Sequence, residues 1–160
     1  MPQANQRRIA LRVLAGLSAI TLVVPLSTRR VGAQIKRQPI VQPKAATKAA
    51  FLVRAFAMRD AAVKAGDQPY GAIVVKDSRI VGEGPSRVIT GSDATAHAEM
   101  EAIRDASRRL GTRDLSGCIL YSSSPPCAMC ETAAYWARIA KKVHGRAGTD
   151  SGAPRYGGCS

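Results

Sequence analysis

The stretch that decides the fold is TAHAEMEAIRDASRRLG, residues 95–111. Apolar residues recur in it at three- and four-residue spacing and a glycine closes it, so it predicts an amphipathic helix that begins near Thr95 and ends at Leu110. One face gathers Glu99 with Ala102, Ile103, Ala106 and Leu110, and the other gathers Glu101, Arg104, Asp105, Arg108 and Arg109. Glu99 is therefore predicted to be buried, where a carboxylate needs a cation, hydrogen-bond donors or a raised pKa.

Short apolar runs on both sides of this helix predict strands. The expected strands are residues 71–76, 79–82, 118–122 and 141–145, the first two joined as a hairpin. Two more helices are expected, one over the Ala-rich residues 47–65 and one from 127 to about 140. Strands that alternate with helices predict an α/β domain, with helices packed on a sheet that contains parallel pairs.

The first 33 residues have the features of an export signal. Arg7 and Arg8 precede the uncharged residues 13–28, and residues 31–33 resemble a small-residue cleavage site. The arginine pair partly resembles a twin-arginine signal. The uncharged run of sixteen residues is short for a bilayer span, which needs about 20.

These features predict three segments, with a signal peptide over 1–33, a linker or extension over 34–47 and the folded domain over 48–160. We expect a periplasmic or secreted protein with no stable membrane span after cleavage. An uncleaved anchor and a cytoplasmic protein are the alternatives.

The large net charge of the chain is weak evidence for a nucleic-acid partner. The net charge is +13, but five of the 24 basic residues lie in the first 33 residues, where there is no acid, so the remainder carries 13 − 5 = +8. Aromatic residues make up 4% of the chain and are not interleaved with the basic ones, which gives little support for stacking on single-stranded nucleic acid. A small molecule is expected as the partner ahead of nucleic acid.

Four residues predict a catalytic zinc site. Cys127 and Cys130 lie one turn apart at the start of the predicted third helix, and His97 lies at the start of the second. Two thiolates and one imidazole make three protein ligands, the number that a catalytic zinc uses while a fourth position is left for water. The pattern H-x-E…P-C-x-x-C is the signature of zinc deaminases, in which Glu99 would be the proton shuttle and zinc-bound hydroxide the nucleophile that displaces ammonia.

Two other interpretations of these residues remain open. A zinc-stabilised binding module would keep the ligands without turnover. A redox pair at Cys127 and Cys130 would leave His97 and a buried Glu99 unexplained. We expect no catalytic or metal-binding role for the other cysteines, Cys118 and Cys159, which are read as buried or unimportant thiols. His144 is expected to be an ordinary surface or core residue.

Several stretches carry a resemblance to the cytidine and deoxycytidylate deaminase superfamily, and within it to the guanine deaminase and tRNA adenosine deaminase branch. They are residues 69–72, 95–103, 118–123, 127–130 and 135–137, within about 48–143. The resemblance implies a three-layer fold with a mixed sheet of four to five strands between helices, one zinc ion per chain and a homodimer. It also implies that the backbone amide of Ala98, with Ser86 and Tyr70, contacts the substrate.

The sequence departs from that branch at three positions. Ser86 lies where a base-recognising Asn is expected, Ser124 where Glu precedes the Pro-Cys pair, and Ala128 where Pro separates the cysteines. The branch also continues through another strand and helix, for which the Gly-rich residues 150–160 are either a substitute or the mark of a shortened form.

The zinc motif and the resemblance together predict deamination of a free nucleobase or nucleoside, guanine first, with a tRNA adenosine deaminase as the alternative.

Overall fold

The computed structural model describes residues 39–156, which belong to one unit, Arg37–Ser160. The predicted export signal and its cleavage site, residues 34–38 of the predicted linker and Cys159 lie outside the described residues. Within 39–156, no helix is both long and apolar enough to cross a membrane.

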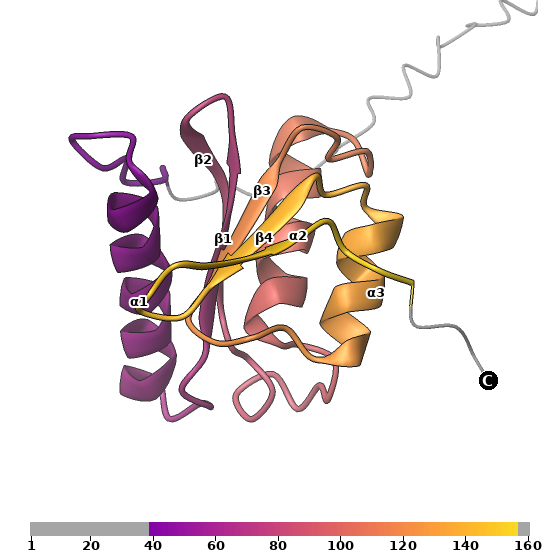
Figure 1. Cartoon of the computed structure of the whole chain (residues 1–160). Coiled ribbons are helices and arrows are strands. Elements are labelled where there is room, and N and C mark those ends of the chain that lie inside the picture. Colours follow the sequence, from indigo (N-terminus) through magenta and orange to yellow (C-terminus); the bar gives the residue numbers. More distant parts are fainter. Residues whose placement is uncertain (1–38, 157–160) are drawn as a thin grey trace, which may run out of the picture. The chain divides into compact units, whose positions relative to one another are not determined.

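Five strands form one mixed sheet with the spatial order β2-β1-β3-β4-β5. They are β1 (Gly71–Lys76), β2 (Arg79–Pro85), β3 (Ile119–Ser122), β4 (Lys141–His144) and β5 (Thr149–Gly152). Only the β3–β4 pair is parallel among the pairs of this sheet, because a helix crosses over between these two strands. The predicted α/β class is confirmed, with helices on both faces of a mixed sheet (Figure 1).

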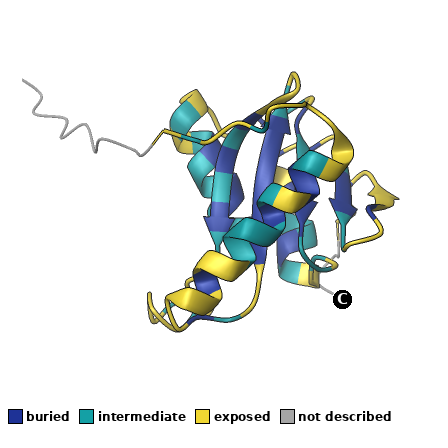
Figure 2. Cartoon of the chain, turned by 90° about the vertical axis from the view of Figure 1, so that its left-hand side faces the viewer, coloured by how far each residue is buried: buried dark blue, intermediate teal, exposed yellow. Residues whose placement is uncertain are grey.

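Three helices complete the layers: α1 (Lys48–Lys64), α2 (Ala98–Leu110) and α3 (Ala128–Trp136). Helix α1 covers one face of the sheet, and α2 and α3 cover the other (Figure 1). In Figure 2, seen from the side of α1, most of this helix is exposed or half-buried, and buried residues fill the strands behind it. The α1 side of the core contains Phe51, Leu52, Ala55, Ile73, Val75, Ile80, Tyr121 and Val143.

Several boundaries differ from those predicted, and one strand was not predicted. Helix α2 begins at Ala98, three residues after Thr95, and β2 extends to Pro85, three residues beyond its predicted end. Helix α3 ends at Trp136, about four residues early, because Arg138 adopts a left-handed conformation (φ 62°) that an α-helix cannot continue. Strand β5 was not among the predicted runs. It carries Thr-Asp-Ser-Gly, all exposed, so it pairs with β4 at the sheet edge without burying a side chain that could mark it in the sequence.

Helix α2 lies unusually close to β2, and this closeness places the start of the helix. A Cβ added at Gly82 would lie 2.5 Å from the Ala102 carbonyl oxygen, and one at Gly84 would collide with the Ala98 carbonyl oxygen. Because only glycine leaves room there, the backbone of α2 rests directly on the strand. The first residues of α2 are thus held at a defined height above the sheet.

Candidate active site

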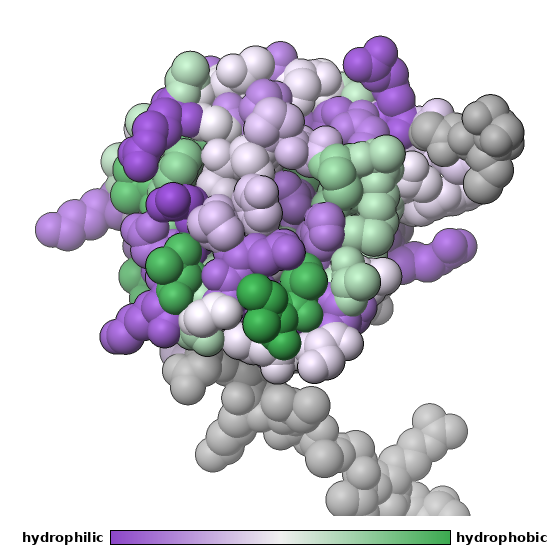
Figure 3. Space-filling view, turned by 90° about the horizontal axis from the view of Figure 1, so that it is seen from below, coloured by the Kyte–Doolittle hydropathy of each residue, from purple (hydrophilic) through white to green (hydrophobic). Residues whose placement is uncertain are grey.

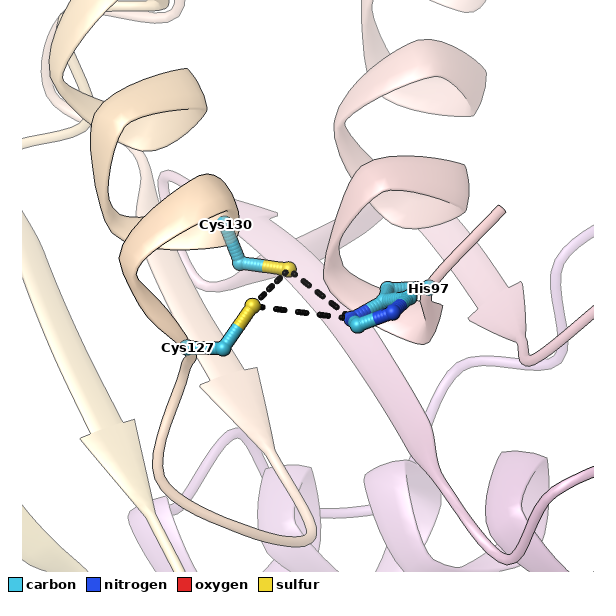
Figure 4. A group of neighbouring side chains, drawn as sticks. All are labelled: His97, Cys127 and Cys130. Atoms are coloured by element: carbon cyan, nitrogen blue, oxygen red, sulfur yellow. Dashed lines mark hydrogen bonds between the residues drawn. The ribbon is translucent and has the colours of Figure 1, made fainter. Parts of the chain in front are cut away.

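His97, Cys127 and Cys130 meet at the point where two helices begin. His97 is the N-cap of α2, Cys127 is the N-cap of α3, and Cys130 lies in the first turn of α3. The Cys127 and Cys130 sulfur atoms lie 3.6 and 3.7 Å from His97 Nδ1 and 3.7 Å from each other. Figure 4 shows the three side chains pointing toward one another across the gap between the helices.

This triangle fits a zinc ion. Tetrahedral zinc with Zn–S of about 2.3 Å and Zn–N of about 2.0–2.1 Å requires S···S and S···N separations of about 3.8 and 3.6 Å. The observed separations match those edges, and all three donor atoms lie within 4.8 Å of one another. Since Nδ1 faces the sulfur atoms, Nε2 would carry the imidazole proton. The predicted three-ligand set is thus brought together by the fold.

The charges around the three candidate ligands also favour a bound cation. Burial, together with the negative charges of Glu99 and Cys127, raises the pKa of the Cys130 thiol far above its usual range. The N-termini of α2 and α3 both point at the cluster and stabilise negative charge there, but by at most about 2 kcal/mol each. A second thiolate beside a buried carboxylate therefore needs a metal ion to balance it.

Glu99 lies where the sequence predicts, buried on the sheet side of α2. It is 5% exposed, and the Cys130 thiol donates to its Oε2 atom over 3.5 Å. Burial raises the pKa of the Glu99 carboxyl group above its ordinary value. The carboxyl group also lines the cavity beside the cluster, so it can reach both the metal position and a bound molecule.

A cavity of about 620 Å³ opens beside the three ligands. Its lining residues are Gln68, Pro69, Tyr70, His97, Glu99, Ser124, Pro125 and Cys127. The helix N-termini lie at the lower end of the molecule in Figure 1, and Figure 3 shows that end from below, with small hydrophobic patches between hydrophilic side chains. Pockets for small ligands have volumes of about 300–1,000 Å³, so this one is large enough for a purine.

The three residues that the resemblance places at the substrate lie in different surroundings. Tyr70 lines the cavity and is 42% exposed. Ala98 is the first residue of α2, where a backbone N–H has no acceptor within the helix, and its side chain is fully buried. Ser86 is 2% exposed, does not appear among the cavity residues, and donates its hydroxyl to Asp67 over 2.8 Å.

Asp67 is a functional candidate that the sequence did not reveal. Its Oδ1 accepts from the Gln68 N–H and the Ser86 hydroxyl, both over 2.8 Å. Its Oδ2 accepts from the Ile89 N–H and from the N–H and hydroxyl of Thr90, over 2.8–3.0 Å. Burial opposes ionisation, but these donors outweigh it and hold the pKa of Asp67 far below its usual range. No local pattern marks the residue, because its partners lie up to 23 positions away.

Comparison with known proteins agrees with this geometry. Residues 45–146 match the family described as the cytidine and deoxycytidylate deaminase zinc-binding region. The chain belongs to this family. Its match includes all four residues of the predicted signature, His97, Glu99, Cys127 and Cys130.

Individual members of the family show which branch the chain resembles. It is 51% identical over 89 residues to guanine deaminase of Bacillus subtilis, covering 55% of this chain and 57% of that protein. It is 45% identical over 89 residues to tRNA-specific adenosine deaminase of Aquifex aeolicus, covering 54% and 59%. The X-ray structure of the Bacillus subtilis guanine deaminase superposes with a TM-score of 0.56 at 49% identity, covering 59% of this chain and 60% of that one. The matches thus span less than two thirds of each relative.

Proposed function

We propose that this chain is a zinc-dependent hydrolytic deaminase of a free nucleobase or nucleoside, with guanine as the first substrate. The proposal rests on one observation. His97, Cys127 and Cys130 lie together, and the buried Glu99 carboxyl group beside them lines the same cavity. The identity to a guanine deaminase supports guanine ahead of other bases.

The side chains divide the chemical work between them. His97, Cys127 and Cys130 would hold the ion, and zinc in such a site supplies water activated for attack at neutral pH. Glu99, which is outside the ligand set, accepts a proton from the water and delivers protons to the ring nitrogen and the departing amine. The oxygen adds to the amidine carbon, the carbon–nitrogen bond breaks, and one water is consumed for each ammonia released.

Ammonia release tests the proposal. The full chain, loaded with about one zinc ion, is incubated separately with guanine, cytosine, cytidine and adenosine, and ammonia and the oxo product are quantified together. We expect equal amounts of both from guanine. A zinc-loaded, folded protein that releases ammonia from none of the four would contradict the proposal and favour a binding module.

A tRNA adenosine deaminase is the second candidate. The 45% identity to a tRNA-specific enzyme and the net charge of +8 that remains after residue 33 (13 − 5 = +8) favour it. It predicts conversion of adenosine to inosine in tRNA without turnover of free guanine. Measuring both reactions in one preparation distinguishes the two candidates.

The location of the protein is part of the proposal. Arg7 and Arg8 before an uncharged run support export to the periplasm or beyond. Expression of the full chain in a bacterium, followed by fractionation and N-terminal sequencing, should give a mature protein that begins near Gln34. An unprocessed chain found with the cytoplasmic fraction would contradict export.

We also propose that two copies of the chain associate. Tyr135, Trp136 and Tyr156 are 44–63% exposed and pack against one another with ring centroids 5.4–5.7 Å apart. Exposed aromatic residues are enriched at protein interfaces, which supports this cluster as the contact. Light scattering should give twice the chain mass for the wild type and a lower mass for Trp136→Ala.

A further inference from the structure

The cavity beside the ligands has a wall whose polar side chains are not used by the metal site. Gln68, Tyr70 and Ser124 line it, and none of these three side chains hydrogen-bonds to another residue of the described part of the chain. Tyr70 and Ser124 each offer a single hydroxyl group. Gln68 offers two N–H donors and a carbonyl acceptor in one planar group, which is the complement of the amide-like edge of a nucleobase.

Ser86 cannot supply that contact in this arrangement. Its hydroxyl is donated to Asp67 and its backbone N–H to the Tyr70 carbonyl oxygen over 3.1 Å. It is buried and lies outside the cavity lining. The polar group that recognises the base must therefore come from another element.

The backbone of Gln68 is held firmly, as a recognition group requires. Its N–H donates to Asp67 over 2.8 Å, and its carbonyl oxygen accepts from the Tyr70 N–H over 2.7 Å, which closes a tight turn. Asp67 is anchored in turn by Ile89 and Thr90. Little conformational freedom is left in this backbone to be lost when a base binds.

We propose that the side-chain amide of Gln68 recognises the exocyclic carbonyl or amino group of the bound base, and that Asp67 is the positioning residue that holds it. This inference rests on the proposed deaminase function. A primary amide donates to a carbonyl group and accepts from an amino group, so Gln68 can serve 6-oxo and 6-amino purines alike.

Binding measured without turnover gives the first test. In the Glu99→Gln background, calorimetry with guanine should show a dissociation constant about 10- to 100-fold higher after Gln68→Leu, because the base loses a partner in a partly buried site. With Glu99 intact, kcat/KM for guanine should fall by a similar factor while zinc content stays near one per chain. An unchanged dissociation constant would overturn the proposal.

An isosteric change gives a second test. Gln68→Glu keeps the shape but removes the donors, so it should weaken guanine, with its 6-carbonyl group, more than 2,6-diaminopurine, with its 6-amino group. We expect the ratio of the two dissociation constants to shift at least tenfold toward the amino purine. A ratio equal to that of unchanged Gln68 would overturn the assignment even if both affinities fall.

Ser86→Ala and Thr90→Val form a matched pair of controls. Each removes one hydroxyl donor from Asp67, but only Ser86 lies where a base contact was expected. If Ser86 acts only through Asp67, the two variants should raise the dissociation constant equally and by less than Gln68→Leu. A larger effect of Ser86→Ala would assign the contact to Ser86 and overturn the proposal.

These measurements distinguish a failure of the proposed deaminase function from a failure of the role given to Gln68. A wild-type protein that holds zinc but deaminates no base contradicts the proposed function and this inference with it. A wild type that deaminates guanine while Gln68→Leu binds it equally well contradicts this inference alone.

Discussion

At the scale of single residues, Glu99 carries the most specific prediction. Glu99→Gln keeps the shape of the side chain but cannot accept a proton, so kcat should fall by about 10²–10⁴-fold. Zinc content should stay near one ion per chain, because Glu99 is not among the ligands. Steady-state ammonia release and metal analysis on the same sample check both parts.

Glu101→Gln is the control for that change. Glu101 lies two residues further along α2, is half-buried, and accepts from Arg104 over 2.8 Å. Loss of this ion pair should cost about 0.5 kcal/mol of stability and leave kcat unaltered. Equal losses of kcat in both variants would mean that a carboxylate on α2 is needed for folding and not for proton transfer.

Asp67 predicts how stability depends on pH. Its pKa in the folded protein lies below the ordinary value of 3.8, so its contribution to stability is fully present above that value and is lost progressively as the pH falls from 3.8 toward the folded pKa. Asp67→Asn should lower the melting temperature of the metal-free protein by a constant amount between pH 8 and 5, and the difference should shrink below about pH 4.

Asp60→Asn is the matched control for Asp67→Asn, because Asp60 is exposed and bonds only to Arg59 among the described residues. It should change the melting temperature little at any pH. A difference for Asp67→Asn that persists undiminished to pH 2 would contradict the role given to its charge.

At the scale of elements, the contact of α2 with β2 positions His97 and the proposed proton shuttle Glu99. Gly84→Ala would force a Cβ into the Ala98 carbonyl group and push α2 from the sheet. We expect a loss of about 3 kcal/mol in the free energy of unfolding of the metal-free protein. Since His97 and Glu99 move with the helix, zinc affinity should fall by about tenfold or more.

Gly111→Ala tests whether this effect belongs to the contact. Gly111 ends the same helix with φ 68° and has free space where a Cβ would be placed. Its substitution should cost about 1–2 kcal/mol from backbone strain and leave zinc affinity unchanged. Urea unfolding and competitive zinc titration measure both quantities, and equal affinity losses at the two positions would contradict the positioning role of β2.

At the scale of the whole molecule, zinc should join α2 and α3 and stabilise the fold. A ligand at 1,000 times its dissociation constant adds about 4 kcal/mol, which corresponds to about 10–20 °C in melting temperature for a domain of this size. Treatment with a strong chelator should remove that increment. Calorimetry with and without chelator measures it.

Two cysteine variants show whether the increment comes from the predicted site. Cys127 is exposed, so Cys127→Ser should abolish the chelator effect without disturbing the core. Cys118 is buried away from the ligands, so Cys118→Ala should lower stability but retain the chelator effect. A chelator effect that survives Cys127→Ser would place the metal elsewhere.

The sequence by itself determined the candidate metal site and the layers of this protein. The C-x-x-C spacing brings two sulfur atoms together on any helix that begins there, because residues three apart share a face. The apolar period of residues 95–111 likewise predicts a buried Glu99, and Gly111 ends the helix as expected. Such features depend on local geometry, so they can be predicted without knowing the rest of the fold.

Only the tertiary structure decided what surrounds that chemistry. Strand β5 pairs through its backbone and carries no apolar pattern, and α3 ends where Arg138 turns toward β4. The bond between Asp67 and Ser86 joins residues 19 positions apart. It occupies Ser86 and leaves Gln68 on the cavity wall, because which donors a buried carboxylate meets depends on how distant loops pack, and no local period in the sequence records that packing.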